Sequence, residues 1–257
     1  MSEADLPSPG EVAVWPEPDR REPDRSDRHY LVLKPLAEQL VSESGRLLGE
    51  RTGLRVLDIG CGNKPYLPLF VNRASSYFGV DAVDGPKVDR VGVAEDLPCS
   101  DGSFDLVLCT QVLEHVDDPV RALEEIQRVL APGGVALIST HGVFLYHPDP
   151  PESDRDYWRW THSGLLRIVG ESGDWDSVKI VSQGNVIACL GYIAAQFADE
   201  FGQKMPGTWP GRLLVRFVNT VTEWLDRHFP PNARFPASGS MSANYLVTAS
   251  KSGDGPD

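Results

Sequence analysis

The chain has 257 residues, 41% of them hydrophobic, and a formal net charge of −13 at pH 7. This length and composition predict one large soluble domain or two small ones, and the negative charge argues against a nucleic-acid partner, because binding to the phosphate backbone depends on Lys and Arg. The four cysteines form no Cys-x-x-Cys pair, which argues against a zinc site. We expect no secretory signal and no transmembrane segment, and therefore a cytoplasmic protein.

Residues 1–28 are rich in Pro, Asp, Glu and Arg and contain few apolar residues. Such a segment buries too little surface to offset its ordering entropy, so we predict a disordered tail followed by one domain over residues 29–257. Leucines at helical spacing predict a helix from His29 to about Glu50, with Pro35 kinking its start.

Strands and helices alternate in the next hundred residues, which predicts a parallel sheet covered on both faces. A helix over 117–130 can be capped by Asp117 or Asp118 and presents one apolar face. The expected strands are residues 55–59, 77–80, 88–93, 104–110 and 135–140.

The last third of the chain has a different pattern. A helix over 162–171 and a strand over 177–182 precede a final strand over 245–250. Between these strands lies an insertion of about residues 184–236, and its pattern predicts a pair of helices, 186–203 and 211–228. We expect this insertion to roof a substrate pocket or to form a homodimer contact, since Asp199 and Glu200 would oppose an anionic membrane surface.

A glycine-rich turn follows the first predicted strand. Gly60 and Gly62 allow a ligand to approach the backbone closely, and a helix capped by Asn63 would receive an anionic group. Asp81 follows the next strand about twenty residues later, where a carboxylate can accept the ribose hydroxyl protons. The order of strand, glycines, helix, strand and acid therefore predicts an adenosine-bearing ligand.

The segment Asp58-Ile59-Gly60-Cys61-Gly62 resembles the first motif of class I S-adenosylmethionine-dependent methyltransferases. Four later segments are similar to blocks of the small-molecule subgroup related to ubiquinone-biosynthesis enzymes, in order and at the usual spacing: 94–98, 101–105, 113–116 and 130–134. This resemblance covers about residues 50–140. It implies an α/β, Rossmann-like, seven-stranded and mostly parallel sheet, with an antiparallel last strand and the helical insertion before it.

The resemblance also implies the contacts to S-adenosylmethionine. Gly60 and Gly62 would face its methionine part, and Asp81 would bind the ribose. Many relatives carry Asp where this chain has Val93, so the adenine contact would come instead from the Ala94 backbone or from the side chains of Glu95 or Asp96. The complete predicted set is Asp58, Gly60, Cys61, Gly62, Asp81, Ala82, Ala94, Glu95, Thr110, Gln111 and His115, with Thr110 and Gln111 near the methionyl amino group.

A dinucleotide-binding oxidoreductase is the rival interpretation of the glycine turn. Its fingerprint requires a third Gly or Ala. Pro65 stands at that position, and Asp58 directly before the turn fits a methyltransferase better. The sequence therefore favours S-adenosylmethionine as the cofactor.

Methyl transfer to a hydroxyl group benefits from a general base, because the hydroxyl pKa is high. His141 directly follows the predicted strand 135–140 and is the first candidate, and His147 is the second. Either could instead be a loop histidine that hydrogen-bonds only to the backbone. For His115 we favour a role in ordering the cofactor loop.

Aromatic residues between this strand and the next helix suit a sugar or a planar ring. Tyr146, Tyr157 and Trp158 are the predicted substrate contacts, although Trp158 and Trp160 could equally pack in the domain's own core. His141, His147 and the acids Asp149, Asp154 and Asp156 could bind Mg²⁺. Acids in a Pro-rich loop are usually only solvated, so we assign no metal ligands.

The leading hypothesis for the reaction is O-methylation of a sugar or oligosaccharide hydroxyl with a His base. It rests on this loop and on a similarity of residues 157–161 to polysaccharide-associated methyltransferases. C- or N-methylation of a quinone-like or amine metabolite is the alternative. A hypothesis of another class is a non-catalytic binding subunit that uses the helical insertion as its interface.

Overall fold

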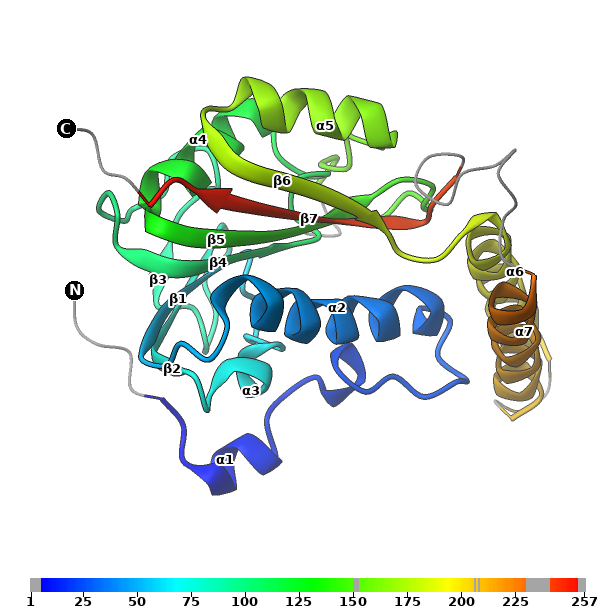
Figure 1. Ribbon diagram of the computed structural model, residues 1–257. Coiled ribbons are helices and arrows are strands. Elements are labelled where there is room, and N and C mark those ends of the chain that lie inside the picture. The colour runs from blue at the N-terminus through cyan, green and yellow to red at the C-terminus, as the bar shows by residue number, and fades with distance from the viewer. Residues whose placement is uncertain (1–5, 150–152, 206, 208, 230–240, 254–257) are drawn as a thin grey trace.

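The computed structural model describes residues 6–149, 153–205, 207, 209–229 and 241–253. In these residues seven strands form one sheet in the order β3-β2-β1-β4-β5-β7-β6 (Figure 1). The last strand, β7, runs antiparallel to β5 and β6, while the neighbouring strands from β3 to β5 pair in parallel. The predicted α/β fold class is confirmed. The strands are β1 (Leu54–Ile59), β2 (Ala74–Asp81), β3 (Arg90–Val91), β4 (Phe104–Thr110), β5 (Leu130–His141), β6 (Trp175–Ser182) and β7 (Asn244–Lys251).

The central strands are apolar along nearly their whole length because helices cover both faces of the sheet. Helix α2 (Tyr30–Leu48) lies along one face, and α4 (Pro119–Val129) and α5 (His162–Glu171) lie on the other (Figure 1). The Asp118 side chain caps α4 by accepting hydrogen bonds from the backbone N–H groups of Val120 and Arg121. The carboxyl ends of β1, β2, β4 and β5 consequently meet at one edge of the sheet, where ligands bind in open α/β folds.

The chain after the glycine turn differs from the prediction. Asn63 caps no helix: its side-chain amide donates to Glu17, and Lys64 adopts a positive φ of 53°. The next helix, α3 (Leu67–Phe70), is a single turn. The cofactor turn is therefore held by loop contacts rather than by the start of a long helix.

The N-terminal segment is ordered, which corrects the predicted disordered tail for residues 6–28. It contains helix α1 (Pro9–Ala13) and the 3₁₀ helix η1 (Pro18–Arg20). Trp15 is only 8% exposed, and its indole N–H donates to the Lys64 carbonyl at 2.9 Å. One buried Trp supplies a large apolar contact area, so the polar composition of the segment was misleading.

The same segment is also tied to the helical insertion. The Asn219 side-chain amide donates to the backbone carbonyls of Arg25 and Asp27, each at 2.8 Å. The Arg25 guanidinium lies 2.6 Å from the Glu223 carboxylate. Residues 6–28 thus connect the glycine turn at one end of the domain to the inserted helices.

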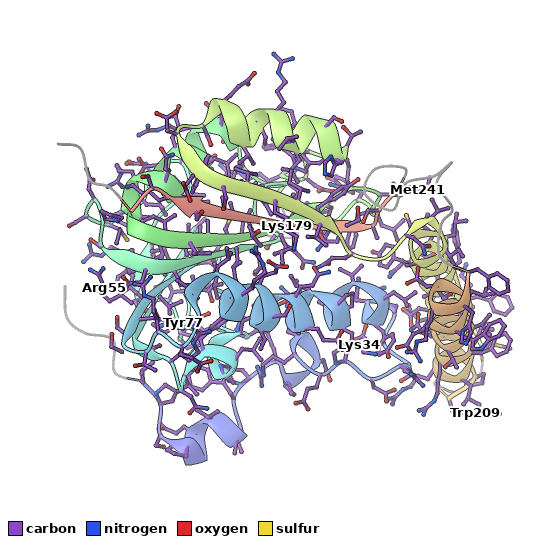
Figure 2. All side chains as sticks on the ribbon, viewed as in Figure 1. Lys34, Arg55, Tyr77, Lys179, Trp209 and Met241 are labelled. Carbon is purple, nitrogen blue, oxygen red and sulfur yellow. The ribbon has the colours of Figure 1, made fainter. Side chains whose placement is uncertain are left out.

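The insertion is a pair of helices, α6 (Val186–Gln203) and α7 (Trp209–His228), that stands at one end of the sheet (Figure 1). Gly202 and Gly211 meet so closely that a Cβ on Gly202 would lie 2.2 Å from the Gly211 Cα. Figure 2 shows Trp209 at the outer side of this pair. Several large apolar side chains of the two helices are exposed: Leu190, Phe197, Phe201, Trp209, Leu213, Phe217 and Trp224. In the described part of the chain, no helix is long and apolar enough to cross a membrane.

Replacing Trp15 with Ala tests whether the N-terminal segment is part of the folded domain. Loss of this buried indole should lower the free energy of unfolding by about 3 kcal/mol, as for other large-to-small substitutions at packed positions. Denaturant unfolding measures the effect. Val14→Ala is the matched control, because the Val14 side chain is 82% exposed. Equal stability of the Trp15→Ala variant and the unmodified chain would show that the segment does not pack.

Candidate active site

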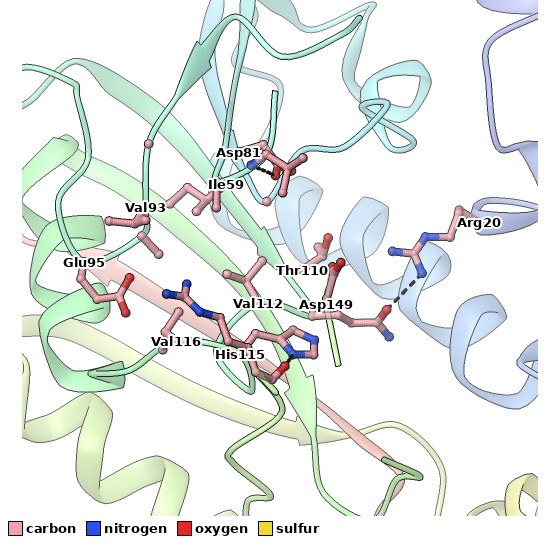
Figure 3. A pocket seen from close by; sticks show the side chains of 17 residues that line it. Arg20, Ile59, Asp81, Val93, Glu95, Thr110, Val112, His115, Val116 and Asp149 are labelled. Carbon is pink, nitrogen blue, oxygen red and sulfur yellow. Dashed lines mark hydrogen bonds between the residues drawn. The ribbon is translucent and has the colours of Figure 1, made fainter. Parts of the chain in front are cut away.

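A pocket opens at the carboxyl ends of β1, β2 and β4 (Figure 3). Ile59 and Asp81 lie at one end of it, Val93 and Glu95 at its side, and Arg20 reaches toward it from the N-terminal segment. Most of the predicted cofactor residues line this pocket: Gly60, Asp81, Ala82, Ala94, Glu95, Thr110, Gln111 and His115.

Gly60 has to be glycine for two reasons. Its φ is +65°, and a Cβ at this position would lie 2.3 Å from a methyl carbon of Val112. The backbone N–H groups of Gly60 and Cys61 both donate to the Val80 carbonyl at the end of β2. These contacts fix the turn and keep this wall of the pocket free of side chains.

The Asp81 carboxylate is held in place by the backbone. One oxygen accepts from the Gly62 N–H at 2.8 Å, and the other accepts from the Val83 N–H at 2.9 Å. An ionised carboxylate offers about four acceptor positions, so lone pairs remain for two hydroxyl donors. This arrangement suits the two ribose hydroxyls of an adenosine.

Three predicted cofactor residues, Asp58, Cys61 and Gly62, do not line the pocket. Asp58 is 1% exposed and accepts a hydrogen bond from the Tyr77 hydroxyl at 2.7 Å. Burial raises the pKa of Asp58 to about 7 despite this hydrogen bond. Asp58 therefore contributes to the structure of the turn and not to the pocket lining. Gly62 contributes through its N–H, which donates to the Asp81 carboxylate.

Two arginines that no sequence motif indicated, Arg20 and Arg155, also line the pocket. The Arg20 guanidinium donates to the Gln111 side-chain oxygen at 3.1 Å, and Arg155 lies beside His115 in the lining. Gln111 has a positive φ of 58°, which is uncommon for a residue with a side chain. The Glu95 side chain is also held in place, because its carboxylate accepts a hydrogen bond from the Asp117 N–H at 2.8 Å.

S-adenosylmethionine fits the residues present. Asp81 offers acceptors for the ribose, and Ile59, Val93 and Val112 offer apolar surface for the adenine ring. Thr110, Gln111 and Asp149 offer oxygen atoms to a methionyl ammonium group. The glycine at position 60 leaves open the space that a Cβ would fill.

A second cavity, of about 430 Å³, lies next to the cofactor pocket and shares Arg20 and Gln111 with it. Its walls come from the N-terminal segment, the start of α2 and the chain after β5. They are mostly polar or charged: Glu17, Asp19, Arg20, Asp27, Arg28, His29, Gln111, His141 and His147, with Val32, Leu33 and Phe144.

A buried pair of titratable groups stands at this second cavity. Glu114 has no exposed surface, and its Oε1 lies 2.9 Å from His141 Nε2, outside hydrogen-bond geometry. The Thr140 hydroxyl donates to Glu114 Oε2 at 2.7 Å. Burial alone would raise the pKa of Glu114, but the neighbouring His141 and the Thr140 hydroxyl lower it to about 2. Glu114 is therefore an ionised carboxylate at neutral pH.

Three predicted histidines come together here. The His147 ring centroid lies 4.9 Å from that of His141 and 5.0 Å from that of His115. The His141 ring stacks on Phe144 with centroids 3.5 Å apart. Burial and the nearby His141 lower the pKa of His147, which favours its neutral form.

The predicted substrate aromatics lie outside these two cavities. Tyr146, Tyr157 and Trp158 line neither of the two, and Tyr146 is 67% exposed. The Trp158 indole N–H donates to the Val116 carbonyl, and the ring stacks on Trp160. The backbone N–H groups of Tyr157 and Trp158 both donate to the Glu114 carbonyl, so this segment positions Glu114 instead.

The family is shown by comparison with known proteins. The model of a family described as "Methyltransferase domain" matches residues 27–169, which is more than half of the chain. The chain belongs to this family and has the class I, S-adenosylmethionine-dependent methyltransferase fold.

Curated relatives match the same part of the chain. The ubiquinone biosynthesis O-methyltransferase of Pseudomonas aeruginosa is 31% identical over 126 residues, covering 42% of this chain and 51% of that protein. The enzyme of the same name from Dinoroseobacter shibae is 34% identical over 125 residues, covering 42% of this chain and 50% of that protein. The chain thus spans about half the length of these relatives.

Solved structures share the fold at low identity. The [4+2]-cyclase SpnF aligns with a TM-score of 0.52 at 21% identity, covering 84% of this chain and 82% of that one. Phosphoethanolamine N-methyltransferase 2 of Haemonchus contortus, in complex with S-adenosyl-L-methionine, aligns with a TM-score of 0.51 at 19% identity, covering 91% of this chain and 59% of that one. Because proteins of this fold include a cyclase as well as methyltransferases, the fold alone does not define the reaction.

Replacing Asp81 with Ala should weaken binding of S-adenosylmethionine by about 10–100-fold, because hydrogen bonds to a charged group contribute about 1.5–3 kcal/mol. Isothermal titration calorimetry measures the change. Asp84→Ala is the control, because Asp84 lies in the same loop, accepts only from the Gly85 N–H among described contacts and does not line the pocket. Equal affinities for the two variants would contradict the assignment of Asp81 to the ribose.

Proposed function

We propose that the chain is an S-adenosylmethionine-dependent O-methyltransferase that acts on a hydroxyl of a sugar or oligosaccharide. The observation that carries the proposal is the second cavity, which is lined by several charged side chains and adjoins the cofactor pocket at Arg20 and Gln111. Carboxylates, guanidinium groups and imidazoles can hydrogen-bond to several hydroxyls at once, and Phe144 offers one apolar face for a sugar ring. The relatives named as O-methyltransferases support oxygen as the methylated atom.

His141 is the proposed general base, as the sequence indicates. It lines the acceptor cavity, and the ionised Glu114 beside its Nε2 stabilises a positive charge on the ring once a proton is taken up. The bound cofactor would supply an electrophilic methyl group on a sulfonium sulfur. The chain's own part is to orient the hydroxyl in the cavity and to accept its proton at His141.

The polar lining also bears on the alternative acceptors. A quinone-like molecule would offer few hydrogen-bond partners to charged side chains of the cavity such as Asp19, Asp27 and Arg28. An amine has one specific observation in its favour, the three acids Glu17, Asp19 and Asp27 in the cavity wall. A methyl-transfer screen with radiolabelled cofactor against sugars, phenols and amines separates these classes, and labelling of amines alone would refute O-methylation.

Replacing His141 with Ala should lower the rate of methyl transfer by about 10²–10⁴-fold, the usual contribution of a general base. Affinity for S-adenosylmethionine should stay the same, because His141 does not line the cofactor pocket. Rates are measured on the best acceptor of the screen, and circular dichroism confirms folding. His162→Ala, on helix α5 away from both cavities, is the control. An unchanged rate in the His141→Ala variant would exclude this base.

We further propose a homodimer through the helices of residues 186–228. The exposed aromatic side chains of α6 and α7 form an apolar surface of a kind that marks interaction sites. Sedimentation velocity should show a dimer that the double substitution Phe197→Glu and Phe217→Glu converts to monomer. Leu166→Glu, at a 46% exposed position of α5, should leave the dimer intact. A monomeric unmodified chain would contradict the proposal.

A further inference from the structure

We propose that Glu114, His115 and His147 bind a first-row divalent transition-metal ion at the boundary between the two cavities. Each of the three residues offers one ligand atom, and these atoms lie within 4.8 Å of one another. His115 lines the cofactor pocket, and His147 lines the acceptor cavity. An ion held by both would therefore lie between methyl donor and acceptor.

The hydrogen bonds of the two histidines prepare them as ligands. His115 Nδ1 lies 2.7 Å from the Arg155 carbonyl oxygen, and His147 Nδ1 lies 3.0 Å from the Leu145 carbonyl oxygen. A carbonyl oxygen only accepts, so Nδ1 carries the hydrogen in both rings and the lone pair is on Nε2. Metal-bound histidines usually donate their other ring N–H to a carbonyl or carboxylate in this way.

The polar atoms around Glu114 are an independent sign of a ligand. Glu114 Oε1 and His141 Nε2 lie 2.9 Å apart without hydrogen-bond geometry, and the buried His141 Nδ1 makes no hydrogen bond within the described chain. Glu114 has no exposed surface, and the His141 side chain is 1% exposed. Buried polar groups without partners are uncommon in folded proteins and often face an ion or a water molecule. A cation beside Glu114 would stabilise its negative charge in addition to His141 and the Thr140 hydroxyl.

The chemistry of the three protein ligands determines which metal ion the site prefers. Two imidazoles and one carboxylate suit Zn²⁺ and its neighbours in the first transition row, and three such protein ligands leave a position open for substrate. Mg²⁺ prefers carboxylates and water. The acids that the sequence suggested for Mg²⁺ are not the ones that cluster: Asp156 is paired with Arg159 at 2.7 Å. Zinc was disfavoured only because the cysteines form no pair.

The use of the ion rests on the proposed O-methylation. A hydroxyl bound at the open position would have a lower pKa and would lose its proton more readily. His141 lies outside this ligand set, with its Nε2 2.9 Å from Glu114 Oε1. His141 is then the base and not a ligand, and the two roles can be separated by experiment.

Metal content of the complete chain tests the site directly. After treatment with EDTA, incubation with Zn²⁺ and dialysis, elemental analysis should find about one Zn²⁺ per chain. His115→Ala and His147→Ala should each weaken Zn²⁺ binding by at least about 100-fold, since even the loss of an outer-shell partner costs 10–100-fold. An equal concentration of Mg²⁺ should not displace the ion. Both substituted side chains are partly exposed, so these variants should fold.

His228→Ala is the matched control. His228 lies on α7 with its Nδ1 2.8 Å from the Trp224 carbonyl oxygen, so it has the same local hydrogen bond without the cluster. This variant should keep the full metal content. Zn²⁺ binding that survives in both His115→Ala and His147→Ala, or no binding by the unmodified chain, would overturn the proposed site.

The same samples distinguish failure of the metal site from failure of the proposed function. His141→Ala should bind Zn²⁺ and S-adenosylmethionine but lose methyl transfer. EDTA should stop methyl transfer without lowering affinity for S-adenosylmethionine. Full activity in EDTA would refute the metal site and leave O-methylation standing, whereas Zn²⁺ binding without methylation of any hydroxyl would refute the proposed function alone.

Discussion

The buried negative charge of Glu114 is the constraint around which the rest of the site is arranged. A carboxylate out of contact with water is costly unless neighbouring groups stabilise it. Thr140 at the end of β5 donates to one of its oxygens, and His141 lies against the other. The backbone carbonyl of Glu114 accepts from Tyr157 and Trp158. One residue therefore joins the end of β5, the loop after β4 and the segment before α5.

The N-terminal segment forms one wall of the second cavity. Trp15 fixes it against the glycine turn, and Asn219 fixes its other end to α7. Between these two anchors, Arg20 donates a hydrogen bond to Gln111, and both residues line both cavities. The inserted helices stand at the end of the sheet (Figure 1). They nevertheless hold residues of the cavity wall, because Asn219 of α7 donates to the carbonyls of Arg25 and Asp27.

Local signals in the sequence predicted most of the fold. The strand over 104–110 and the helix over 162–171 match β4 and α5 residue for residue, because each has a continuous apolar pattern or a capping Thr. Contacts between distant residues were not predictable from such signals. Trp15 bonds to a carbonyl 49 residues away, and Asn63 bonds to Glu17 instead of capping a helix.

The same distinction between local signals and contacts of distant residues applies to the site. Gly60 and Asp81 were predictable because a parallel sheet brings the carboxyl ends of its strands together. The pairing of Glu114 with His141 joins two strand ends, and the sequence placed both residues there without showing that they touch. The sequence also did not show that the indole N–H and the backbone N–H of Trp158 donate to the carbonyls of Val116 and Glu114. Residues that line the second cavity, such as His29, lie just after a segment that composition alone marks as disordered.

The proposed donor and acceptor cavities meet at Arg20 and Gln111, beside the cluster of Glu114, His115, His141 and His147. A crystal structure of the complete chain with S-adenosylhomocysteine tests this arrangement most directly. We expect the ribose to lie against Asp81 and the sulfur to lie beside Gln111, facing His141 and His147. The nucleoside bound in the acceptor cavity, or the sulfur directed away from the histidines, would contradict the account.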